Sequence, residues 1–128
     1  MLDHIGLTVS DHAASRGFYD AVLTAIGIDR VLEVTAEQTG AHAHTGYGKD
    51  GKPFFWIGGG ATVSGPIHAA FTVESRAHVD AFHAAGLAAG GTDNGAPGLR
   101  PYYHPDYYGA FILDPDGNNI EAVCHQPA

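Results

Sequence analysis

Positive charge and cysteine are both scarce in this 128-residue sequence. Six Lys and Arg stand against fourteen Asp and Glu, and no basic run occurs anywhere. The resulting negative field opposes polyanions, so neither a nucleic acid nor an anionic membrane surface is an expected partner. The only cysteine, Cys124, cannot form an internal disulfide, which is compatible with a reducing compartment.

Long apolar runs are also missing. No segment approaches the ~20 apolar residues of a membrane span, and the N-terminus has neither the basic region nor the apolar stretch of a signal peptide. We therefore expect a cytoplasmic protein without a membrane partner. The length fits one compact domain that is stable without disulfides.

An internal repeat is the most informative feature that the sequence does contain. A shift of 64 residues, the separation of His4 and His68, also places Thr8 on Thr72 and Phe18 on Phe82. We read the repeat as two modules of a single domain that spans residues 1–128. Module 1 covers residues 1–60, a Gly-rich linker covers 59–65, and module 2 begins at residue 66.

Each module is predicted to begin with a strand and a helix. The first strand contains His4, and its equivalent is expected at 67–73. Ser10 or Asp11 is placed to cap the first helix and Ser75 the second. Further strands are predicted at 30–35, 42–48 and 53–58. A hairpin is predicted at 111–123, with its turn at residues 114–117. Residues 92–107 are predicted to form a long loop with a short strand. The fold class is α+β, with eight strands in a curved sheet and helices outside.

Two histidines and a glutamate are the candidate metal ligands. His4 and His68 occupy equivalent repeat positions and therefore lie on equivalent faces of their strands. Glu121 faces away from Ile120 and Ala122, so it enters the same cavity if those two residues pack on the helices. Two imidazoles and one carboxylate leave open positions on a divalent ion, as a catalytic site requires.

Three sequence features together resemble the vicinal oxygen chelate superfamily. They are the opening His-Ile-Gly-Leu-Thr-Val-Ser-Asp, the histidine at the start of the second repeat, and the closing Asp-Pro-Asp-Gly-Asn-Asn-Ile-Glu. The superfamily includes glyoxalase I, extradiol dioxygenases, methylmalonyl-CoA epimerase, and fosfomycin- and bleomycin-resistance proteins. The resemblance covers nearly the whole chain. It implies two tandem βαβββ modules forming a cup-shaped, eight-stranded mixed sheet, with one divalent metal (Zn, Fe, Mn, Ni or Co) on residues matching His4, His68 and Glu121.

Departures from the family patterns narrow the chemistry that the resemblance implies. Glyoxalase I and the epimerases commonly use a carboxylate on the last strand of the first module, where this chain has Trp56 and no acid. Extradiol dioxygenases carry a tyrosine before the closing turn, where this chain has Phe111. Fosfomycin-resistance enzymes surround their substrate with several cations, whereas Arg100 is the only basic residue near the predicted pocket.

Aromatic and histidine side chains supply the remaining site candidates. In segment 100–108, Arg100 is a candidate for binding a substrate carboxylate. The candidate catalytic residues for proton transfer are Tyr103, His104 and Glu121 itself. The other candidate substrate-binding residues are Tyr107, Tyr108, Trp56, His42 and His44. Cys124 is expected to be a buried, inert thiol.

The favoured function is a metal-dependent, glyoxalase-like lyase or isomerase. Its substrate is a small metabolite that chelates the ion through adjacent oxygens, and the ion stabilises an enolate or alkoxide. One alternative is an Fe(II) extradiol-type dioxygenase. The other is a metal-independent protein that binds an aromatic compound or an antibiotic. We expect a homodimer, although the cup is compatible with modules from one chain or from two.

Overall fold

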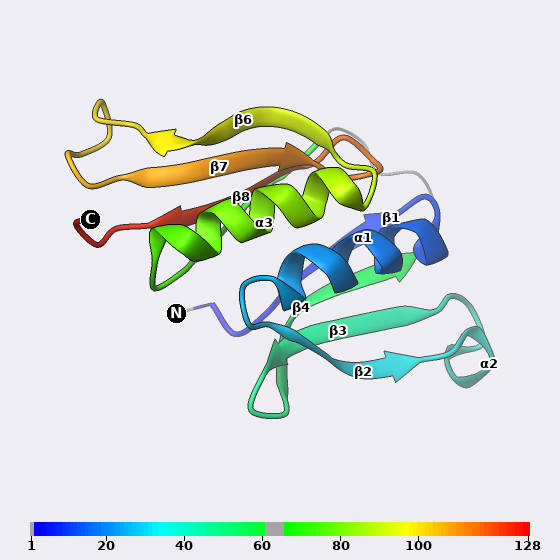
Figure 1. Ribbon diagram of the computed structural model, residues 1–128. Helices are drawn as coiled ribbons and strands as arrows, with labels where there is room; N and C mark the ends of the chain where they lie inside the picture. Colours follow the sequence, from blue (N-terminus) through cyan, green and yellow to red (C-terminus); the bar gives the residue numbers. More distant parts are fainter. Residues whose placement is uncertain (1, 61–65) are drawn as a thin grey trace.

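The structure is a computed structural model that describes residues 2–60 and 66–128. It confirms the α+β class and the paired βαβββ modules (Figure 1). The elements of module 1 are β1 (Ile5–Val9), α1 (His12–Thr24), β2 (Asp29–Val34), a short α2 (Ala36–Thr39), β3 (His44–Lys49) and β4 (Lys52–Gly59). Those of module 2 are β5 (His68–Thr72), α3 (Arg76–Ala88), β6 (Thr92–Leu99), β7 (Tyr108–Leu113) and β8 (Asn119–Cys124).

The eight strands form two four-stranded mixed sheets with the same topology. Their orders are β1-β4-β3-β2 and β5-β8-β7-β6, and in each sheet the first two strands are parallel and the others antiparallel. The register is equivalent as well, since Gly6 lies opposite Trp56 and Ala70 lies opposite Glu121. Trp56 therefore occupies in module 1 the place that Glu121 occupies in module 2.

The two long helices begin at capping residues that the sequence marks. The Asp11 side chain accepts a hydrogen bond from the Ala14 N–H, and the Ser75 hydroxyl accepts one from His78. These caps satisfy backbone donors that would otherwise lack an intrahelical partner. Gly27, with a φ of 79°, reverses the chain after α1 at little steric cost.

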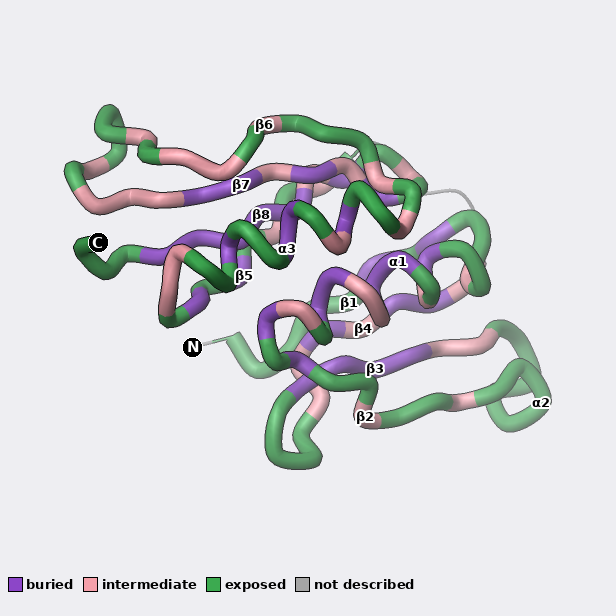
Figure 2. The backbone as a smooth tube through the Cα atoms, viewed as in Figure 1, coloured by how far each residue is buried: buried purple, intermediate pink, exposed green. Residues whose placement is uncertain are grey.

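One hydrophobic core joins the two modules. Helices α1 and α3 lie side by side over the sheets, and buried segments concentrate between helices and strands, whereas β2 and β6 are largely exposed (Figure 2). Ile112 and Ile120 are fully buried on the helix side of the second sheet. The rings of Phe55 and Phe71 meet across the modules with centroids 5.3 Å apart. Each sheet thus buries one face against the helices and leaves the other for a site.

The structure differs from the sequence prediction at β6. This strand runs for eight residues through a segment predicted to be mostly loop. Pairing with β7 supplies hydrogen bonds that outweigh the poor strand propensity of its Gly and Pro residues. The β6–β7 pairing is nevertheless irregular, with register shifts on both sides of Gly95, whose φ is 151°.

Other boundaries also shift. The helix α2 was not predicted; it begins at a capping box in which Thr35 and Gln38 bond to each other's backbone N–H. His4 and His42 lie before β1 and β3 rather than within them, and Gly58 and Gly59 belong to β4. The rest of the predicted linker, residues 61–65, lies outside the described residues. No helix in the described part of the chain is both long and apolar enough to span a membrane.

Candidate active site

Glu121 lies on the open face of the second sheet, away from the helices. Its neighbours Ile120 and Ala122 are fully buried in the core, so the alternation of β8 points Glu121 to the opposite side. Even there, Glu121 is only 2% exposed. A buried carboxylate requires partners, and two side chains from other segments supply them.

His68 is the first partner of this carboxylate. Its Nε2 lies 3.0 Å from Glu121 Oε1, and its Nδ1 lies 2.9 Å from the backbone carbonyl of Asn119. A carbonyl only accepts, so in this contact Nδ1 donates to Asn119 and Nε2 is the ring atom that faces Glu121. The Nε2–Oε1 contact is a hydrogen bond when Nε2 carries a proton, and the same two atoms would be ligands of one metal ion when it does not. The carbonyl contact on Nδ1 is the arrangement usual for metal-binding histidines.

Tyr107 is the second partner. Its hydroxyl donates a hydrogen bond to Glu121 Oε2, and Gly109 provides the space beside that oxygen. Burial, followed by the bond to Glu121, raises the pKa of the Tyr107 hydroxyl above its usual range. Tyr107 therefore remains a neutral donor at physiological pH and occupies Oε2, so Oε1 is the oxygen that faces His68.

His4 is not brought to Glu121 within the chain. Its side chain is 62% exposed, and its Nδ1 contacts Asp3, which also pairs with Lys52. His4 and His68 do line a common pocket of about 530 Å³ between β1 and β5. Within residues 2–60 and 66–128, however, no group of three His, Cys, Asp or Glu side chains is close enough to hold one ion. The donors present fit two ligands of a metal, not three.

The open face of the first sheet forms a second pocket, of about 570 Å³. His4, His44 and Trp56 are among the residues that line it. Gly46 lies opposite Trp56, and a Cβ there would approach the indole to 2.9 Å, so glycine makes room for the ring. Trp56 therefore gives the first sheet an aromatic side chain at the position where the second sheet has the carboxylate of Glu121.

The tyrosine-rich turn between β6 and β7 lies beside Glu121. The ring of Tyr103 packs against that of Tyr107 in a tilted arrangement, with centroids 4.7 Å apart. The backbone N–H of Asp106 donates to His104 Nδ1, so His104 Nε2 carries the proton and donates to His125 Nδ1 at 2.9 Å. His125 was not among the predicted site residues. The sequence pattern that could have identified His125 is the alternation of β8, which places Glu121, Val123 and His125 on the same face.

Besides His44 and Trp56, two more of the predicted substrate-binding residues lie apart from Glu121. Tyr108 belongs to the helix side of β7, where its hydroxyl donates to Asp80 of α3 and Arg76 lies 5.1 Å from its ring centre. His42 is exposed, and its carbonyl accepts from Nδ1 of His44. The predicted burial of Cys124 is confirmed.

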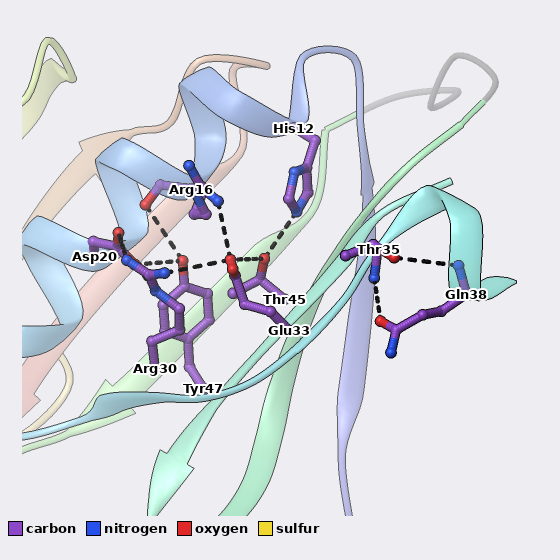
Figure 3. A network of polar contacts seen from close by, with 9 residues as sticks. All are labelled: His12, Arg16, Asp20, Arg30, Glu33, Thr35, Gln38, Thr45 and Tyr47. Carbon is purple, nitrogen blue, oxygen red and sulfur yellow. Dashed lines mark hydrogen bonds and ion pairs between the residues drawn. The ribbon is translucent and has the colours of Figure 1, made fainter. Parts of the chain in front are cut away.

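A polar network between α1 and the first sheet was not predicted (Figure 3). The buried hydroxyl of Thr45 contacts His12 Nε2 at 2.8 Å and donates to Glu33, which pairs with Arg16. Desolvation and the nearby Arg16 charge lower the pKa of His12. His12 is therefore a neutral donor to Thr45, and the network stabilises module 1 rather than completing a catalytic site.

Comparison with known proteins gives one consistent result. The family model described as the Glyoxalase/Bleomycin resistance protein/Dioxygenase superfamily matches residues 1–122. A glyoxalase/bleomycin resistance protein from Albidiferax ferrireducens T118 is 30% identical, with a TM-score of 0.74 over 98% of both chains. Comparison with curated proteins gave no match.

Two more distant structures share the fold. The fosfomycin resistance protein FosX from Listeria monocytogenes, a mutant complexed with Mn(II) and a dihydroxypropylphosphonic acid, has a TM-score of 0.70 at 18% identity, covering 96% of this chain and 90% of its own. A glyoxalase I mutant from Zea mays also has a TM-score of 0.70, at 20% identity, over 95% of this chain and 45% of its own.

Proposed function

Because the chain belongs to the Glyoxalase/Bleomycin resistance protein/Dioxygenase superfamily, we propose that it is a metal-dependent enzyme acting on a small, oxygen-chelating metabolite. The observation that carries the proposal is the contact between His68 Nε2 and Glu121 Oε1. The two atoms face each other, and hydrogen bonds at the far nitrogen of His68, to Asn119, and at the other oxygen of Glu121, from Tyr107, orient the two side chains. The pair is arranged for a shared cation.

The proposed chemistry is glyoxalase-like lyase or isomerase chemistry. His68 and Glu121 would hold a divalent metal, which would supply Lewis acidity toward an enolate or alkoxide oxygen of the substrate. Tyr107 holds Glu121 in place and limits the access of water to it. His104, bonded to His125 in the adjacent turn, is the proposed proton carrier.

We propose that a second copy of the chain supplies the third ligand. His4 is exposed, so it is available to another subunit, and the described residues of one chain bring together only two donors. In a symmetric dimer, His4 of each copy would then join His68 and Glu121 of the other, giving two identical sites. The third ligand therefore makes the homodimer part of the proposed function.

The first experiment is metal analysis of the purified protein and of Glu121→Gln. The expected result is about one equivalent of Zn, Fe, Mn, Ni or Co per chain in the parent and a large loss in the variant. Glu37→Gln, which removes an exposed carboxylate on α2, is the matched control and should retain the metal. Metal retained in Glu121→Gln would defeat the proposal. Iron, together with oxygen uptake on catechols, would favour the dioxygenase alternative.

Mixing two inactive variants tests the shared site. A dimer of His4→Ala with Glu121→Gln retains one complete set of ligands only if His4 comes from the other subunit. Metal binding should therefore recover in one of the two sites of each heterodimer, about a quarter of all sites, after equal amounts of the variants are unfolded and refolded together. No recovery, despite exchange of subunits, would show that each cup belongs to one chain.

A metal-independent binding protein is the second candidate. The absence of a three-donor group among the described residues favours it, as does the Trp56 pocket, which offers an aromatic surface to a ligand. Tight ligand binding that neither a chelator nor Glu121→Gln weakens would establish this candidate in place of the enzyme.

A further inference from the structure

We propose that Arg100 binds the anionic group of the substrate, which makes the substrate a small organic carboxylate with adjacent oxygens at its other end. The inference rests on the proposed function, because those oxygens are assigned to the side of the site that His68 and Glu121 form. It deepens that function by naming the substrate class.

Arg100 lies on the same face of the second sheet as the candidate metal ligands. Phe111 is directly opposite Glu121 in the β7–β8 ladder, so both side chains point away from the helices. The guanidinium carbon of Arg100 lies 5.5 Å from the centre of the Phe111 ring, and the His68 ring lies 6.2 Å from the same centre. One aromatic surface thus borders both the cation and the metal-binding pair.

The guanidinium is held in place by the backbone of β6. Its two terminal nitrogens donate to the carbonyls of Gly98 and Ala96, each at 2.8 Å. A Cβ on Gly98 or on Gly95 would lie 3.2 or 3.3 Å from those nitrogens, so the glycines let the group settle against the strand. A preorganised guanidinium loses little conformational entropy when it binds an anion.

The charge of Arg100 has no acidic partner in the described part of the chain. The other arginines, Arg16, Arg30 and Arg76, each lie within ion-pair distance of a carboxylate, and Arg100 does not. Only two of the five N–H groups of Arg100 have a hydrogen-bond acceptor within residues 2–60 and 66–128. A fixed, unneutralised guanidinium in a protein with a net charge of −8 is matched to a bidentate anion such as a carboxylate.

The test compares two ligands that differ only in the distal charge. α-Ketoglutarate has a distal carboxylate, whereas its 5-methyl ester is uncharged at that end; oxaloacetate and α-ketoadipate vary the reach. Binding is measured by calorimetry with and without Mn²⁺. We expect the parent protein to prefer the carboxylate by about tenfold or more, and Arg100→Gln to lose most of this preference. Arg30→Gln, which removes a paired guanidinium from β2, should keep it.

The outcomes separate this inference from the proposed function. An equal preference for the carboxylate in the parent and in Arg100→Gln, or no binding of any of these keto acids, would overturn the inference while metal binding at Glu121 still stood. Conversely, a preference that depends on Arg100 but is indifferent to Mn²⁺ and to Glu121→Gln would support the anion site and contradict the metalloenzyme. A purely structural role of Arg100 would lower the melting temperature without changing the ratio of the two affinities.

Discussion

The hydroxyl of Tyr19 in α1 donates a hydrogen bond of 2.6 Å to Oδ2 of Asp114, which belongs to the turn between β7 and β8. Asp114 is also the centre of that turn, because its carboxylate accepts from the backbone N–H groups of Asp116 and Asn118. Asp116 in turn accepts from Ser10 at the end of β1. The closing hairpin therefore fastens module 2 to module 1 as well as reversing the chain.

Tyr19→Phe should lower the free energy of unfolding by about 1–3 kcal/mol, because it leaves a buried carboxylate short of a donor. Urea denaturation measures the change. Tyr102→Phe removes a hydroxyl from a side chain that is 74% exposed and should be close to neutral. Equal stability of the two variants would show that the bond between the modules contributes nothing.

The tyrosines predict a loss of stability at alkaline pH. Burial, followed by a neighbouring Asp or Glu, raises the pKa of Tyr19, Tyr47 and Tyr107, and a hydrogen bond to Asp80 raises that of Tyr108. A folded-state pKa above the unfolded value means that the unfolded chain releases protons first. Stability should therefore be intact below about pH 10 and fall above it. Tyrosinate absorbance during a pH titration should rise together with unfolding; complete ionisation of a still folded protein would contradict this.

His12 predicts an effect on the acid side. Desolvation lowers the folded-state pKa of His12 below the usual 6.5. At pH values between the folded-state pKa and 6.5, His12 is therefore mostly protonated in the unfolded chain and mostly neutral in the folded protein. Its contribution to stability is present above pH 6.5 and is lost as the pH falls through this window. Histidine NMR titration should give His12 a pKa below 6.5. The variant His12→Gln should weaken the dependence of unfolding free energy on pH there, and an unchanged dependence would refute the assignment.

Tyr107→Phe should weaken metal binding by roughly tenfold to a hundredfold, because a hydrogen bond that orients a metal ligand is lost. Calorimetric titration with Mn²⁺ or Co²⁺ measures the affinity. The adjacent Tyr108→Phe is the matched control, since its hydroxyl contacts Asp80 on the opposite side of the sheet. Equal affinities in the two variants would remove Tyr107 from the site.

Several features could be predicted because each depends on a few neighbouring residues. Alternation along a strand places Glu121 opposite Ile120 and Ala122, and hydrogen-bonding side chains mark the helix starts at Asp11 and Ser75. The repeat of His4 at His68 indicates the paired modules. These are local rules of backbone geometry, so they hold without knowledge of the fold.

Tertiary structure alone decided which side chains meet. β6 exists because β7 supplies hydrogen bonds to a segment with poor strand propensity. The hydrogen bond of Tyr107 to Glu121 depends on where the β6–β7 turn ends. That of Tyr108 to Asp80 depends on the packing of α3 against the sheet. His4 shares a repeat position with His68 yet stays away from Glu121 within one chain. Periodicity specifies the face on which a residue lies, whereas the packing of the two modules determines its partners.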